Sequence, residues 1–173
     1  LPLPAPAGML AATGDRLQLY ALLAGGTELL RLDLASWQTN LHVRVASPAV
    51  DLVAVPFLPQ QVVIYEPAAG LQLLYDGVPR GPVVGDPGWI EPDLAGSSVV
   101  SYAGNLVRYN AAGTSLKRVV SGVGSFTGAN AWGGFRVLED RVYFADGTRW
   151  QSPNALITRY TGVTGGVDVL PDL

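Results

Sequence analysis

Short apolar runs, several of which alternate with polar residues, follow one another along the whole chain. Leu30-Arg31-Leu32-Asp33-Leu34 alternates with a period of two, which is the pattern of a β-strand with one buried face. The best candidate for a helix, residues 21–36, contains this alternation and is interrupted by Gly25-Gly26. Elsewhere the runs are rich in Val and Tyr and are separated by Gly, Pro, Asn and Asp. The pattern therefore predicts an all-β protein rather than an α/β fold.

One unit recurs four times: a short strand that ends in Tyr, a small turn that contains Gly, and a second apolar strand. The four strands end at Tyr20, Tyr65, Tyr109 and Tyr160, which are 45, 44 and 51 residues apart. A wholly β repeat of about 40 to 50 residues has the length of one four-stranded blade of a β-propeller. We therefore predict a β-propeller-like array of about four four-stranded blades. A β-sandwich or barrel, in which the Tyr spacing is a coincidence, is the alternative.

The prolines divide the chain. Three of the first six residues are Pro, so residues 1–8 are expected to form an extended arm. The rest is expected to be a single β-repeat domain over 9–173, with repeats at roughly 9–47, 48–92, 93–134 and 135–173. Gly/Pro-rich segments such as 77–82 and 122–134 are predicted to connect one blade to the next. The chain starts at Leu1 without Met, which fits both a mature chain after signal removal and a piece of a longer protein.

The hairpins also resemble known propeller families. Leu19-Tyr20-Ala21-Leu22 followed by Gly26-Thr27-Glu28-Leu29-Leu30 is similar to the blade hairpin of quinoprotein-like propellers, and residues 106–114 resemble hairpins of NHL-type and YVTN-type surface-layer propellers. The resemblance implies a fold and not a chemistry. Quinoprotein-like blades carry a Trp that docks the next blade. In this chain that position holds Arg31, Tyr75, Arg118 or Leu170. We therefore transfer no cofactor from the family and expect none.

Composition limits the possible partners. Charged residues make up 14% of the chain and hydrophobic residues 49%, against a usual charged share of about 25%. The low charge indicates either a surface partly covered by an assembly or a compact domain with a neutral surface. The net charge is −3 with singly scattered Lys and Arg, so we expect no nucleic-acid partner. Without Cys there are neither disulfides nor thiolate metal sites, and no apolar run is long enough to cross a membrane.

The titratable candidates are few. His42 is the only histidine, and the alternation around it places it on the polar face of a strand, so we predict an exposed strand residue and no metal site. Glu91 and Asp93 form the closest carboxylate pair in a turn-like setting. Side chains two residues apart on an extended segment point the same way, so this pair could bind a cation or a sugar, or lie on a solvated loop.

Two Gly-containing segments carry aromatic residues. Asp146-Gly147-Thr148-Arg149-Trp150 is similar to a degenerate Asp-box turn of propellers and equally fits a type I′ hairpin turn, both of which are structural roles. Residues 122–134 contain Phe126 and Trp132 on a Gly-rich stretch that precedes no helical pattern, so a phosphate-binding loop is not predicted. The two aromatic side chains could anchor a partner or pack between blades.

These features favour a non-catalytic binding or structural module over an enzyme. We expect it to present loops to a protein or glycan partner, or to self-associate, within a larger extracytoplasmic assembly (secreted, cell surface or virion). The candidate binding residues are Trp89, Glu91, Asp93, Phe126, Trp132 and Trp150. A propeller-type glycosidase or lyase that acts through Glu91, Asp93 or Asp146 is one alternative, and a viral or surface-layer coat component is another.

Overall fold

A computed structural model describes residues 3–85, 88–94, 96–102, 106–121, 135–138, 141–144, 148–151 and 156–159. These residues form sixteen strands in four four-stranded sheets and contain no helix. The first sheet contains β1 (Ala7–Ala12), β2 (Gln18–Leu23), β3 (Glu28–Asp33) and β4 (Thr39–Arg44). The second sheet contains β5 (Asp51–Ala54), β6 (Gln61–Glu66), β7 (Gly70–Tyr75) and β8 (Val78–Val84).

The third sheet contains β9 (Trp89–Pro92), β10 (Ser98–Tyr102), β11 (Leu106–Asn110) and β12 (Lys117–Ser121). The fourth sheet contains β13 (Phe135–Leu138), β14 (Arg141–Phe144), β15 (Thr148–Gln151) and β16 (Leu156–Arg159). In every sheet the strands pair antiparallel in the order of the chain. The prediction of an all-β array of about four four-stranded blades is confirmed.

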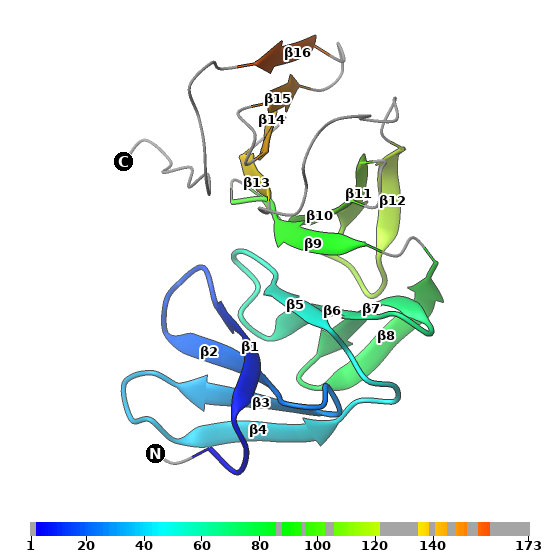
Figure 1. Cartoon of the computed structure of the whole chain (residues 1–173). Coiled ribbons are helices and arrows are strands. Elements are labelled where there is room, and N and C mark those ends of the chain that lie inside the picture. Colours follow the sequence, from blue (N-terminus) through cyan, green and yellow to red (C-terminus); the bar gives the residue numbers. More distant parts are fainter. Residues whose placement is uncertain are drawn as a thin grey trace.

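The four sheets follow one another along an arc, each packed face to face against the next (Figure 1). The strands that lie between two sheets bury both of their faces. In β6, Val62 and Ile64 face the first sheet while Val63 faces the third, and all three are fully buried. Two-sided burial explains why this strand is a continuous apolar run instead of an alternating one. Between the third and fourth sheets the layer is aromatic, with Tyr102 and Phe144 rings 5.3 Å apart.

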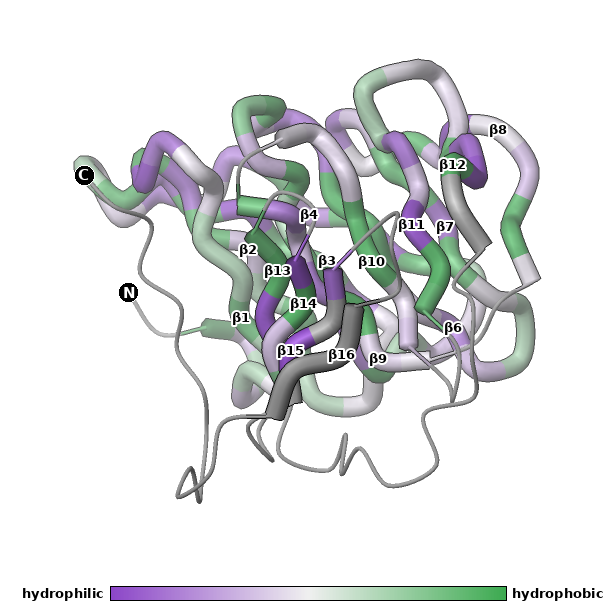
Figure 2. The backbone as a smooth tube through the Cα atoms, turned by 90° about the horizontal axis from the view of Figure 1, so that it is seen from above, coloured by the Kyte–Doolittle hydropathy of each residue, from purple (hydrophilic) through white to green (hydrophobic). Residues whose placement is uncertain are grey.

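The first strands of the sheets lie at the inner side of the arc. β1 contacts β5, β5 contacts β9, and β9 contacts β13. The fourth strands β4 and β8 lie on the outer side, and their side chains are mostly exposed. The third sheet shows the same difference, because β10 is mostly buried and the fourth strand β12 begins with the hydrophilic residues Lys117 and Arg118 (Figure 2). The inner strands thus place their side chains around one common space.

The phase of the sequence repeat differs from that of the sheets. Tyr20 and Tyr65 lie on the second strands β2 and β6, but Tyr109 lies on the third strand, β11. Tyr160 lies outside the described residues. The hairpin signal, a Tyr-ending strand before a small Gly turn, is compatible with any hairpin of a four-stranded sheet, so it does not identify which hairpin it marks. The proposed arm and repeat boundaries stay predictions.

Two segments predicted as connections or turns are strands. Most of 77–82, expected to join two blades, belongs to β8, an outer edge strand on which Pro79 and Pro82 are tolerated. Residues 89–92, expected to be turn-like, form the inner strand β9, with Pro92 as its last residue. Pro and Gly normally indicate the end of a strand, but an edge strand or the last position of a strand accommodates them. The second Gly-rich segment, 122–134, lies outside the described residues.

Candidate functional site

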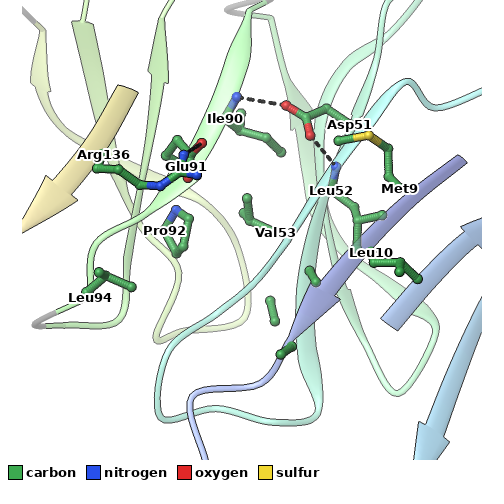
Figure 3. A pocket seen from close by; sticks show the side chains of 13 residues that line it. Met9, Leu10, Asp51, Leu52, Val53, Ile90, Glu91, Pro92, Leu94 and Arg136 are labelled. Carbon is green, nitrogen blue, oxygen red and sulfur yellow. Dashed lines mark hydrogen bonds and ion pairs between the residues drawn. The ribbon is translucent and has the colours of Figure 1, made fainter. Parts of the chain in front are cut away.

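A cavity of about 420 Å³ lies where the inner strands converge (Figure 3). Its wall comes from β1, β5, β9 and β13 together with Leu94, two residues after the end of β9. Met9 and Leu10 are adjacent on β1, so their side chains point to opposite faces: Met9 packs against the core between the first two sheets, and Leu10 is 57% exposed at the rim. Asp51, Glu91 and Arg136 supply the charges of the wall. The cavity therefore joins an apolar rim to two carboxylates and one guanidinium.

Asp51 begins β5 and is buried. Its Oδ1 accepts a hydrogen bond from the Leu52 N–H (2.8 Å), and its Oδ2 accepts one from the Ile90 N–H on β9 (3.1 Å). Burial raises the pKa of this carboxyl to about 6, although both hydrogen bonds act in the opposite direction. Asp51 thus connects the inner strands of the second and third sheets, and each of its oxygens already holds a backbone donor.

Glu91 makes the next connection along the inner strands. Its Oε1 accepts a hydrogen bond from Arg136 Nη1 on β13 at 2.6 Å, and the same nitrogen donates to the Phe135 carbonyl oxygen (2.9 Å). Burial raises the pKa of Glu91 to about 7; the guanidinium of Arg136 lowers it and the carboxylate of Asp51 raises it further. Glu91 therefore ties the third sheet to the fourth and carries the most perturbed carboxyl of the cavity.

Asp93 does not line this cavity. It is buried, and its Oδ2 lies 3.6 Å from Arg108 Nη2. Its backbone forms an isolated parallel bridge to Val137 on β13. Glu91 and Asp93, which the sequence grouped as one pair, are thus each held by a different arginine. Neither lies on a solvated loop.

The aromatic candidates are dispersed. Trp89 starts β9 opposite Tyr102 and is 53% exposed. Trp150 lies on β15 opposite Val142, and its side chain is outside the described part of the structure. Phe126, Trp132 and Asp146 also lie outside the described residues. Among these candidates, the described residues bring only Glu91 to the cavity.

His42 is an exposed strand residue, as predicted, and its Nε2 lies 3.1 Å from Glu28 Oε2 on the neighbouring strand. Among the described residues no three acidic or histidine side chains are grouped so that they could hold a metal ion. Within the same residues no helix could cross a membrane.

Sequence reasoning missed the role of Arg31. This residue, which stands where quinoprotein-like blades have their docking Trp, forms an ion pair with Asp76 of the second sheet (Nη1–Oδ1 2.6 Å). Its guanidinium lies 5.9 Å from the centre of the Tyr20 ring, and the Tyr20 hydroxyl donates to the Pro59 carbonyl oxygen (2.8 Å). The sequence did contain a signal for this role. Arg31 stands in place of the Trp of the family pattern, and it likewise makes a contact with the next blade.

Both carboxyl groups of the cavity are engaged by other groups. Hydrolysis of glycosides uses two carboxyl groups that flank the substrate. Both oxygens of Asp51 accept hydrogen bonds from backbone N–H groups, and Glu91 is held by Arg136. Leu10 is the most exposed large apolar side chain of the wall.

Comparisons with known proteins are consistent with this architecture. No family model matches the chain, and no curated protein matches it. Among solved structures, U3-55K superposes with a TM-score of 0.68 at 11% identity, over 97% of this chain and 55% of that one. The C-terminal WD40 domain of Sif2 gives 0.56 at 18% identity, over 91% and 47%, and BamB from Moraxella catarrhalis gives 0.59 at 12%, over 91% and 54%.

These likenesses show a β-propeller-type fold, so the resemblance expected from the hairpins is confirmed at the level of fold. The chain spans about half the length of the propellers that it matches. Its four sheets superpose on part of those larger propellers.

Proposed function

We propose that this chain is a non-catalytic binding or structural module that presents its loops and cavity rim to a protein partner within a larger assembly. The observation that carries this proposal is the propeller-type arc, whose inner strands surround an open cavity. Binding residues lie disproportionately on loops that a rigid scaffold holds in place.

The chemistry of the cavity supports binding over turnover. Each described carboxylate near it has a fixed partner: Asp51 the backbone, Glu91 the guanidinium of Arg136, and Asp93 that of Arg108. A general acid or a nucleophile needs a free path to its substrate. The three acids instead connect neighbouring sheets or strands, which is a structural task.

We further propose an extracytoplasmic location. The proposal rests on the sequence, because a chain without Cys has no thiol that an oxidising compartment could oxidise. Fractionation of the source cells with an antibody against the chain tests this. Recovery of the chain in the cytoplasmic fraction alone would overturn it.

The binding proposal is tested with the purified full chain and two variants. Leu10→Ser removes the apolar rim of the cavity, and the matched control Val119→Ser removes an equally exposed side chain (57%) on the outer strand β12. The partner is captured by crosslinking in the source cells, purified, and titrated against each variant. We expect Leu10→Ser to weaken binding and Val119→Ser to leave it unchanged.

Activity is measured in parallel on a panel of glycosides and polyuronides, with wild type and Glu91→Gln. We expect no turnover by either protein. Turnover by wild type that Glu91→Gln abolishes would show a propeller-type glycosidase or lyase instead. If Leu10→Ser and Val119→Ser weaken partner binding equally, the cavity rim is not the binding site.

A further inference from the structure

Three exposed apolar side chains lie at turns on one end of the first two sheets. Leu17 is 60% exposed at the start of β2, Trp37 is 54% exposed between β3 and β4, and Phe57 is 68% exposed between β5 and β6. Inner strands of neighbouring sheets run in the same direction, so these turns lie at the same end of the strands. In Figure 1 they project to the left.

The three turns also touch one another. The Leu34 N–H donates a hydrogen bond to the Leu17 carbonyl oxygen (2.9 Å), which joins the outer turn of the first sheet to its inner turn. Gly14 in the inner turn lies against the backbone of Pro56 and Phe57, so a Cβ at Gly14 would be 3.3 Å from the Phe57 nitrogen. Residues 13–17, 33–37 and 56–58 therefore form one continuous surface, which we call the ledge.

The backbone of the ledge is held in an unfavourable conformation. Arg16, Trp37 and Phe57 have φ values of 58°, 56° and 63°, in the left-handed region that bulky residues avoid. Among the other positive-φ positions, Gly25, Gly26 and Gly70 lie in the β2–β3 and β6–β7 turns at the opposite end, and Asp76 and Gly77 lie in the β7–β8 turn at the same end. Glycine would suit the ledge turns equally well. Large side chains are kept there despite the strain, which points to a role for the side chains themselves.

Completion of a ring would leave the ledge exposed. The sheets pack on one another through their faces, as the three apolar layers of this chain show. Further blades would therefore cover sheet faces and surround the cavity. Turns at the ends of the strands project along the ring axis, away from these contacts.

The ledge carries oriented negative charge. Asp15 Oδ1 accepts hydrogen bonds from the Thr13 hydroxyl and the Leu17 N–H, and Asp33 Oδ1 accepts them from the N–H groups of Ala35 and Ser36. These bonds hold the pKa of both carboxyls below the ordinary value, so both are ionised at neutral pH. The only cation in the three turns is Arg16. A cationic partner would complement this surface.

We propose that the ledge binds a polypeptide segment of a partner protein in which a large apolar side chain is flanked by Arg or Lys. The apolar side chain packs against Trp37, Leu17 and Phe57, and the basic residues pair with Asp15 and Asp33. Aromatic anchors surrounded by charged rims are the usual arrangement of such contacts. This inference rests on the proposed binding function and assigns it a second surface, distinct from the cavity.

The test starts with random peptides displayed on phage and selected on the wild-type chain. We expect the enriched peptides to contain an aromatic or large aliphatic residue between basic ones. One enriched peptide is then titrated by fluorescence anisotropy against a Trp37→Asn/Phe57→Asn variant, which is expected to fold because Asn tolerates positive φ. Its affinity should fall about tenfold or more.

An Asp15→Asn/Asp33→Asn variant separates charge from shape, because an Asn oxygen accepts the same turn hydrogen bonds. It should bind the peptide several-fold more weakly at low salt and show less salt dependence. The control Val119→Ser should bind as wild type does, and circular dichroism checks that each variant is folded.

Absence of enrichment, enrichment of acidic peptides, or equal affinity of wild type and the ledge variants would each overturn the proposal. These results are distinct from failure of the proposed function. If Leu10→Ser loses the natural partner while the ledge variants keep it, the module binds through its cavity and the ledge inference is wrong.

Discussion

The two carboxyls of the cavity should make the protein more stable as the pH falls from 8 to 5. Both Glu91 and Asp51 have raised pKa values because burial disfavours their charged forms. A group whose pKa is raised on folding binds its proton more tightly in the folded state. Its contribution is therefore most favourable below the unfolded pKa and is lost as the pH rises through the folded pKa. Most globular proteins instead lose stability when the pH is lowered.

The shifts give the size of the effect. For Glu91 the change from 4.5 to about 7 corresponds to about 3 kcal/mol of unfolding free energy, and for Asp51 the change from 3.8 to about 6 corresponds to a similar amount. The two carboxyls interact, so their sum is an upper bound. The window lies between about pH 4 and 7. Below it, Asp15 and Asp33, whose pKa values are lowered, act with the opposite sign.

Urea unfolding followed by tryptophan fluorescence at several pH values between 5 and 8 measures this. The variant Glu91→Gln removes one titrating group and keeps an oxygen that can accept from Arg136. Wild type should gain roughly 2 to 3 kcal/mol from pH 8 to pH 5 more than this variant does. If both proteins show the same pH dependence, Glu91 is not a buried acid with a raised pKa and the reasoning fails.

Three further substitutions test the packing. Phe144→Ala should lower the free energy of unfolding by about 3 to 5 kcal/mol, because Phe144 is fully buried and its ring lies 6.0 Å from that of Phe135; a loss below about 1 kcal/mol would contradict the aromatic layer. Arg31→Met should cost about 1 kcal/mol through the lost ion pair with Asp76, and a stability equal to wild type would show that the pair contributes nothing. Phe57→Gly should raise stability by up to about 1 kcal/mol by relieving the left-handed strain, whereas the same change at Leu17, which has no positive φ, should lower it; all are measured by urea unfolding.

Strand content and blade size could be predicted from the sequence because they depend on local patterns. Runs such as Val62-Val63-Ile64 predict strands, and the spacing of hairpins predicts a repeat of blade length. The position of each hairpin within its sheet could not be predicted in the same way. It depends on which face of a strand meets the next sheet, as for Tyr109 on β11, and that contact is made by residues from another repeat.

Glu91 was a candidate from the sequence, but Asp51 and the arginine partners of Glu91 and Asp93 were missed for a related reason. Asp51 looks like the polar start of an apolar run, and only the Ile90 N–H, 39 residues later, makes it a buried connection. Glu91 and Asp93 look like an exposed pair, since Pro92 between them indicates a turn. In the fold they lie on and directly after an inner strand, and two arginines from different sheets reach them. Local sequence specifies the strand but not the distant partner of its charges.

The outward face of the first sheet and the ledge differ in whether other residues cover their apolar side chains. The outward face of the first sheet, where a preceding blade would pack in a ring, buries Ala21, Leu23 and Leu30 beneath Leu3 and Ala5 of the Pro-rich start of the chain. That segment therefore covers part of this sheet face. No comparable segment covers Trp37 and Phe57 among the described residues. Because blades pack on one another through sheet faces and the ledge lies at turns, further blades would not cover its exposed aromatic residues. Their exposure is instead consistent with a separate partner at the ends of the strands.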